Sequence, residues 1–123
     1  MQILHIENSP EICDLYADLY GRRNHVIDSV NDGREGLKLV LKNNYDIILL
    51  DILMPRYSGM DFLRELKEKR PSELRKVIVV SQLDFDDGQL EEISKFGINS
   101  IQKKAPDLIE YENSGTLQIK QWL

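Results

Sequence analysis

Two stretches of sequence decide the fold: DIILLD at residues 46–51 and KVIVVS at residues 76–81. Each has the length of a strand, is continuously apolar at its centre and contains several β-branched residues. A strand that is apolar on both faces needs cover on both faces, which is typical of the inner strands of a parallel sheet. Outward from this pair, more polar runs of strand length lie at residues 2–6, 25–30 and 98–102.

Patterns typical of helices lie between these five runs. Ser9 and Pro10 supply a cap and a first-turn proline, and the apolar residues that follow keep to one face until Gly21. Similar segments lie near residues 36–41, 60–66 and 90–96. The alternation predicts an α/β fold. We expect a flavodoxin-like, doubly wound five-stranded parallel sheet with strand order 2-1-3-4-5 and helices on both faces.

Length and composition indicate one domain over residues 1–123, in which residues 105–123 show no clear period and form a divergent C-terminal segment. The 16 Lys and Arg against 21 Asp and Glu give a formal net charge of -5, which disfavours direct binding to nucleic acid. No apolar run approaches the roughly 20 residues of a membrane helix. The lone Cys13 excludes an internal disulfide, and we expect a cytoplasmic protein without membrane contact.

Polar side chains follow the expected strands at their carboxyl ends, where an open α/β sheet binds its ligands. In chain order they are Glu7, Asn8, Asp51, Ser81, Lys103 and Lys104. The first and third strands are neighbours in the expected order, so Glu7, Asn8 and Asp51 should converge. A carboxylate can accept a phosphoryl group, oxygen ligands can hold a hard cation, and a hydroxyl and an ammonium can bind phosphoryl oxygens. The set is therefore typical of a phosphoryl-transfer site.

Four segments carry a resemblance to a known family. They are ILHIENSP (residues 3–10), DIILLDILMPRYSGMDFLRELK (46–67), VIVVS (77–81) and GINSIQKK (97–104). The most specific part is Asp51 followed by Met54-Pro55 and then Ser58-Gly59. Through these segments the chain resembles the receiver domain of two-component response regulators, from residue 2 to about residue 104.

The resemblance implies a role for each site residue. Asp51 matches the phosphoacceptor, and Ser81 and Lys104 match the hydroxyl and the ammonium that bind the phosphoryl oxygens. Lys104 is preferred over Lys103 because its spacing from Gly97 fits the family's pattern. The implied ligands of Mg²⁺ all offer oxygen: Glu7, Asn8, Asp51 and the main-chain carbonyl of Leu53.

The function that the resemblance implies is a phosphorylation-dependent signalling switch. Such a domain takes a phosphoryl group from a sensor histidine kinase or a phosphotransfer protein, and it carries the group as an aspartyl phosphate. It is not an enzyme beyond catalysing its own phosphorylation and dephosphorylation. We expect a monomer or weak dimer that passes the signal to a downstream protein by protein–protein contact, without direct contact to nucleic acid.

The chain departs from the family's pattern at several places. Asn8 replaces a usual carboxylate, Gln82 replaces a usual small residue, and Ile101 replaces a frequent aromatic residue. Lys104 is followed by Ala105, with Pro106 one position later than expected. These departures leave an alternative open: a pseudo-receiver that acts as a phosphorylation-independent protein-interaction module.

Other functions fit the sequence less well. A phosphatase of the haloacid dehalogenase type also uses a strand-end Asp, but it needs a second Asp two residues later, where this chain has Leu53. A flavodoxin-like cofactor binder would need a phosphate-cradling loop after the first strand, and none is present in the sequence. Asp84, Asp86 and Asp87 lack the spacing of a calcium loop, and we interpret them as capping the fourth helix.

Overall fold

The computed structural model describes residues 1–52, 57–81 and 85–103. Within them lies one sheet of five parallel strands: β1 (Gln2–Ile6), β2 (Val26–Val30), β3 (Ile47–Asp51), β4 (Val77–Ser81) and β5 (Ser100–Lys103). Their order in the sheet is β2-β1-β3-β4-β5, and every neighbouring pair is parallel. The predicted fold class and strand order are therefore confirmed.

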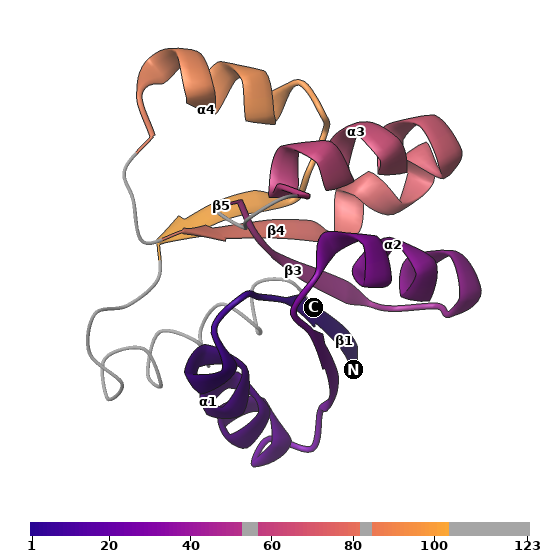
Figure 1. Cartoon of the computed structure of the whole chain (residues 1–123), viewed down its shortest axis with the longest axis vertical. Helices are drawn as coiled ribbons and strands as arrows, with labels where there is room; N and C mark the ends of the chain where they lie inside the picture. The colour runs from indigo at the N-terminus through magenta and orange to yellow at the C-terminus, as the bar shows by residue number, and fades with distance from the viewer. Residues whose placement is uncertain (53–56, 82–84, 104–123) are drawn as a thin grey trace.

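In the described part of the chain, four α-helices and one short 3-10 helix connect the strands. They are α1 (Pro10–Gly21), α2 (Gly33–Lys42), α3 (Gly59–Lys69), η1 (Pro71–Lys76) and α4 (Asp87–Ser94). Figure 1 shows α1 on one side of the sheet and α2, α3 and α4 on the other. The predicted start of the first helix is confirmed, because the Ser9 hydroxyl accepts a hydrogen bond from the Ile12 N–H and Pro10 is the first helical residue.

Two apolar clusters fill the space between the helices and the sheet. On the α1 side, Ile3, Ile47, Leu49 and Ile78 pack among buried residues that include Tyr16. On the other side, alternate residues of the same strands pack against α2 and α3, with members that include Leu4, Ile6, Leu50, Phe62 and Leu66. All five residues of β3 are buried, as the continuous apolar run predicts. Within the described residues, none of the helices combines the length and the apolar composition needed to cross a membrane.

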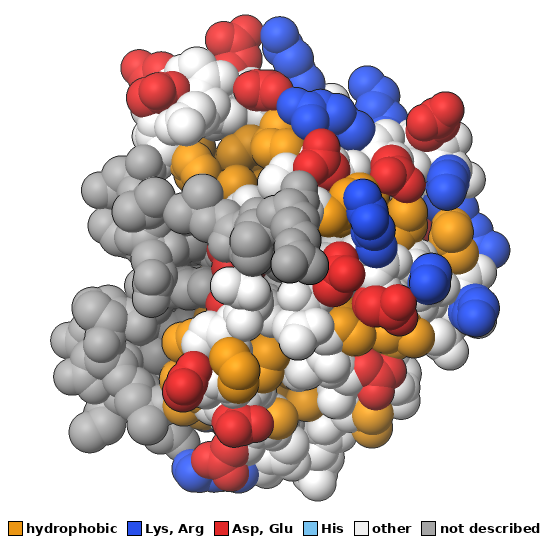
Figure 2. Space-filling model, in the orientation of Figure 1, with side chains coloured by type: hydrophobic (Ala, Val, Ile, Leu, Met, Phe, Trp, Pro, Cys, Tyr) orange, Lys and Arg blue, Asp and Glu red, His pale blue; other side chains and the backbone are white. Residues whose placement is uncertain are grey.

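The fourth helix differs from its predicted pattern. The spacing of Leu90, Ile93 and Phe96 predicted one buried face, but α4 ends at Ser94 and Leu90 is 36% exposed. Of this helix, which is described throughout, only Ile93 is buried. In Figure 2 apolar side chains are visible in a hollow directly below this helix.

Capping of the fourth helix agrees with the sequence interpretation. The Asp86 side chain accepts a hydrogen bond from the Gln89 N–H, and the Gln89 side chain accepts one from the Asp86 N–H. Asp87 is the first residue of the helix, where a negative charge is favourable. Asp84 and the C-terminal segment 105–123 lie outside the described residues.

The start of α3 lies against the backbone at the end of β3. The Gly59 N–H donates to the Ile52 carbonyl over 3.2 Å. A Cβ atom at position 59 would lie 2.6 Å from the Ile52 Cα and 2.7 Å from the Asp51 carbonyl oxygen. Because both obstacles are backbone atoms, no change of rotamer can relieve the contact. The close approach therefore requires glycine, and it fixes the first turn of α3 directly behind Asp51.

This contact predicts the effect of an alanine at position 59. We expect Gly59→Ala to lower the free energy of unfolding by about 1–3 kcal/mol, the usual cost of forcing an extra methyl into packed surroundings. Urea denaturation measures the loss. The matched control is Gly21→Ala at the end of α1, where nothing lies within 4 Å of the added Cβ. That variant should stay within about 1 kcal/mol of the parent, and equal losses in both variants would contradict the argument.

Candidate functional site

Two carboxylates lie side by side in the sheet at its carboxyl edge. Asp51 is the last residue of β3, and Glu7 directly follows β1. The parallel register pairs Ile6 with Leu50, so Glu7 and Asp51 each lie one residue beyond a paired position. Both are buried, with 2% of Glu7 and 7% of Asp51 exposed. Since side chains alternate along a strand, both carboxylates lie on the α1 side of the sheet.

Burial of two neighbouring carboxylates is costly unless a cation or hydrogen bonds compensate their charge. One compensating bond is local, because the Glu7 Oε1 accepts from the Ser9 N–H over 3.2 Å. Carboxylate oxygens at the edge of a sheet are ligands that suit Mg²⁺, which binds proteins through one or two carboxylates and keeps several waters. The described residues contain no group of three or more His, Cys, Asp and Glu that could hold a metal. Within the described part of the chain, this edge therefore offers a cation two carboxylates, Glu7 and Asp51.

The structure places the remaining predicted residues as follows. Asn8 is exposed and directly follows Glu7 in the chain. Ser81 ends β4 and pairs with Lys103 in β5, while Asp51 pairs with Val80. The backbone thus brings the ends of β3, β4 and β5 to one edge. The predicted contributions of Leu53, Gln82 and Lys104 fall outside the described residues.

Ile101 lies in β5 and is partly buried against the core on the side of α2, α3 and α4. It occupies the position at which the resemblance led us to expect an aromatic residue. A β-branched side chain has few rotamers. At this position it can fill less space than an aromatic ring.

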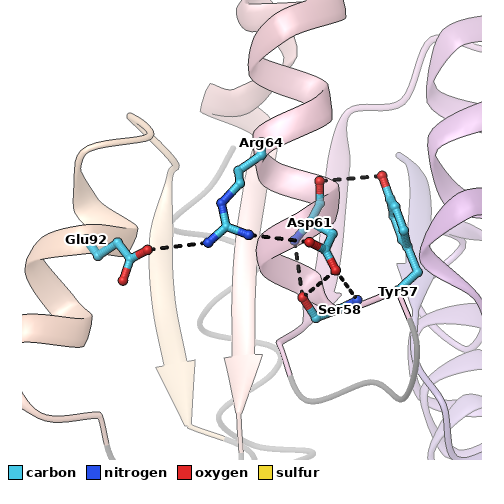
Figure 3. Close-up of polar contacts among 5 residues, drawn as sticks. All are labelled: Tyr57, Ser58, Asp61, Arg64 and Glu92. Carbon is cyan, nitrogen blue, oxygen red and sulfur yellow. Dashed lines mark hydrogen bonds and ion pairs between the residues drawn. The ribbon is translucent and has the colours of Figure 1, made fainter.

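A polar network at the start of α3, near Asp51, was not expected from the sequence. Ser58 caps α3: the Ser58 hydroxyl accepts from the Asp61 N–H over 3.2 Å, and the Asp61 Oδ2 accepts from the Ser58 N–H over 3.0 Å (Figure 3). The spacing of a serine and an acidic residue three positions later is a capping-box signal that could have revealed it. This reciprocal pair fixes the helix start that lies behind Asp51.

Tyr57 anchors the same turn. Its ring is buried, and its hydroxyl donates to the Asp61 carbonyl oxygen over 3.4 Å. The Arg34 guanidinium of α2 lies over the ring, with its carbon 5.3 Å from the ring centroid. Burial, followed by hydrogen bonding to Glu65, raises the pKa of Tyr57 well above its ordinary value, so the ring stays neutral. No periodic pattern in the sequence indicated these contacts.

With this geometry established, the chain can be compared with known proteins. A family model described as the response regulator receiver domain matches residues 3–111. The chain belongs to this family. Its two-component signalling role and its CheY-like fold follow from that membership.

Curated relatives of this receiver domain are longer proteins. The chain is 36% identical over 90 residues to the transcriptional regulatory protein HprR of Escherichia coli, covering 73% of this chain and 39% of HprR. It is 35% identical over 69 residues to the transcriptional regulatory protein ResD of Bacillus subtilis, covering 56% of this chain and 29% of ResD. The receiver domain thus spans well under half the length of these relatives.

Solved structures share its fold at lower identity. The response regulator TrrA of Thermotoga maritima, solved with Mg²⁺ and BeF, has a TM-score of 0.79 at 24% identity and covers 99% of this chain and 98% of TrrA. The chemotaxis protein CheY4 of Vibrio cholerae has a TM-score of 0.80 at 19% identity and covers 96% of each chain. These likenesses support the receiver fold.

The cap of α3 generates a prediction about the pKa of Asp61. The Ser58 N–H first, and the Ser58 hydroxyl second, hold the pKa of the Asp61 carboxyl below its usual value. A lowered pKa stabilises the fold above the ordinary Asp value of about 3.9, and this contribution is lost as the pH falls through the lowered value.

We expect Ser58→Ala to raise the pKa of Asp61 part of the way toward its ordinary value, because the backbone N–H remains as a donor. Carboxyl-carbon NMR titration measures the change. Glu11 in the first turn of α1, whose pKa is lowered first by its own backbone N–H and then by the Ser9 hydroxyl, is the internal control and should keep the same titration curve in both proteins. An unchanged Asp61 would show that the hydroxyl makes no bond to the carboxylate in solution.

Proposed function

We propose that this receiver domain is a phosphorylation-dependent switch in which Asp51 accepts a phosphoryl group from a phosphohistidine. The donor is a sensor histidine kinase or a phosphotransfer protein. The observation that carries the proposal is the burial of Asp51 beside Glu7 at the carboxyl ends of adjacent strands. An oxygen of the Asp51 carboxylate attacks phosphorus, the bond between phosphorus and the imidazole nitrogen breaks, and the imidazole keeps the electron pair. The product is an acyl phosphate on Asp51.

The proposed cofactor is Mg²⁺. Its proposed ligands are Glu7, Asn8, Asp51 and the main-chain carbonyl of Leu53. When bound, the ion offsets the charge of the transferring group and of the two carboxylates. Its presence in the solved complex of TrrA, a protein of the same family, supports this assignment.

Two further residues complete the proposed site. Ser81 would donate its hydroxyl to a phosphoryl oxygen, and Lys104 would place its ammonium beside another. The proposal for Ser81 is supported by its place at the end of β4, one residue beyond the partner of Asp51. The proposal for Lys104 rests on the sequence, where it directly follows the last residue of β5.

We further propose that the signal leaves the domain by protein–protein contact, from a cytoplasmic monomer or weak dimer without direct contact to nucleic acid. The net charge of -5 supports the last point. The curated relatives named above are transcriptional regulators of greater length, which supports an effector as the downstream partner.

One observation favours the second candidate, a pseudo-receiver that binds a partner without phosphorylation. Asn8 supplies no charge where the family usually has a carboxylate, and it is exposed to solvent. A weaker cation site would follow, and phosphoryl transfer depends on that cation.

The main proposal predicts a covalent product. Incubation with acetyl phosphate and Mg²⁺ should add one phosphoryl group, about 80 Da by intact mass. The Asp51→Asn variant should gain nothing, because an amide oxygen does not form the acyl phosphate. The control variant Asp46→Asn removes a carboxylate at the opposite end of β3 and should be phosphorylated like the parent. No mass gain in the parent would favour the pseudo-receiver.

The cation site predicts the effect of restoring a carboxylate at position 8. Two unit charges about 4 Å apart interact by up to ~4 kcal/mol at an effective dielectric of ~20, and solvent around the exposed Asn8 will screen part of this. We therefore expect Asn8→Asp to tighten Mg²⁺ binding by about tenfold, or about 1.4 kcal/mol.

Calorimetry or NMR titration measures this affinity. The control is Asn44→Asp, which adds the same charge at an exposed position before β3, at the amino end of the sheet. If both variants bind Mg²⁺ like the parent, Asn8 is not a ligand. If both tighten binding equally, the effect is that of net charge alone.

A further inference from the structure

Helix α4 is held loosely. A cavity of about 90 Å³ lies between α3 and α4, lined by Ile52, Met60, Phe85, Gln89, Glu92 and Ile93. Most of these lining residues are apolar, and Figure 2 shows apolar side chains in the hollow below α4. Residues that line an apolar cavity lose packing contacts on that side. Helix α4 is therefore not tightly packed against α3 in this arrangement.

Two cations of α3 reach across to α4. The Arg64 Nη2 lies 3.6 Å from the Glu92 Oε1, and the Lys67 Nζ lies 5.9 Å from the centroid of the Phe96 ring that follows α4. Figure 3 shows Arg64 lying between Asp61 of its own helix and Glu92 of α4. The Arg64 and Glu92 side chains of this ion pair are more than half exposed to solvent.

Arg64 also connects α4 to the turn behind the acceptor. Its Nη1 donates to the Asp61 Oδ1 over 3.3 Å, while the Oδ2 of the same carboxylate accepts from the Ser58 N–H and hydroxyl, each over 3.0 Å. Gly59, the next residue, is bonded to Ile52 and lies against the Asp51 carbonyl. A continuous series of contacts therefore runs from the phosphoacceptor strand to Glu92.

We propose that the Arg64–Glu92 ion pair, called the tie below, holds α4 in the arrangement of the unphosphorylated domain. This inference rests on the proposed function of Asp51. The Arg64–Glu92 contact is that of a chain with an unmodified Asp51 carboxylate, and any position of α4 farther from α3 would break it. If a group bound at Asp51 favours another position of α4, part of its binding free energy is used to break the Arg64–Glu92 ion pair. A variant that lacks the ion pair does not carry this cost, so it should bind the group more tightly. An exposed ion pair of this kind changes an equilibrium by about two- to five-fold.

The first test measures the tie without any ligand. Amide hydrogen exchange of residues 87–96 should be about two- to five-fold faster in Arg64→Gln and in Glu92→Gln than in the parent. Exchange in α2 should be unchanged. The matched control is Arg22→Gln, which breaks the Arg22–Asp18 pair of α1, a pair of comparable exposure. If α4 exchanges at the parent's rate in both single variants, there is no tie.

The second test measures coupling to the acceptor with beryllofluoride and Mg²⁺, monitored by NMR. Arg64→Gln and Glu92→Gln should each bind beryllofluoride about two- to five-fold more tightly than the parent. The double variant should bind no more tightly than either single variant, because both changes remove the same pair. The reversed pair, Arg64→Glu with Glu92→Arg, should return the affinity toward that of the parent.

The outcomes separate the two proposals. If the parent binds beryllofluoride and the variants bind it equally well, the inference about Arg64 is wrong and the proposed function stands. If Arg64→Gln changes the affinity and Glu92→Gln does not, the inference is also wrong, because Arg64 would then act through Asp61 and not through Glu92. If the parent binds no beryllofluoride, the proposed function fails and the switching role of Arg64 fails with it, while hydrogen exchange still decides whether the two helices are tied.

Discussion

The structure depends on the burial of β3 on both of its faces. A strand with no exposed residue needs a helix layer on each side, and right-handed crossovers between parallel strands supply these layers. The same burial surrounds Asp51, the last residue of the strand, with protein on all but one edge. A carboxylate there cannot stay charged at low cost without compensation, and Glu7 beside it increases the need. The fold thus places two buried carboxylates together at this edge.

Rigidity is distributed unevenly around this edge. Behind Asp51, a glycine contact, a reciprocal cap and a buried tyrosine fix the first turn of α3. Beside it, α4 is secured by one buried side chain and by exposed contacts to α3. The proposed switch would use both properties, because Asp51 would keep its geometry while another element changes position. In this chain the two properties belong to neighbouring helices that share the Asp61–Arg64–Glu92 contacts.

Local signals in the sequence predicted most elements correctly. Ser9, Pro10 and Gly21 delimit α1 as expected, and the apolar runs at 46–51 and 76–81 became β3 and β4 within one residue. Pro71 follows the end of α3 and is the first residue of η1, because proline cannot continue a helix interior but is tolerated in a first turn. Leu90 falls in the helical segment expected at residues 90–96 and is exposed, since spacing indicates which residues share a face but not how closely that face approaches the sheet.

The sequence by itself determined the order of the elements and, through the rule that ligands bind at the carboxyl ends of parallel strands, the edge at which Glu7, Asp51 and Ser81 meet. These conclusions depend on local periodicity and on chain connectivity, which a sequence displays directly. Only the tertiary structure decided that Glu7 is buried, that Arg34 covers Tyr57 and that Arg64 spans to Glu92. Burial and contacts between helices depend on the distance and the angle between packed elements. Those quantities are set by all the side chains of the core together, and no single segment of the sequence contains them.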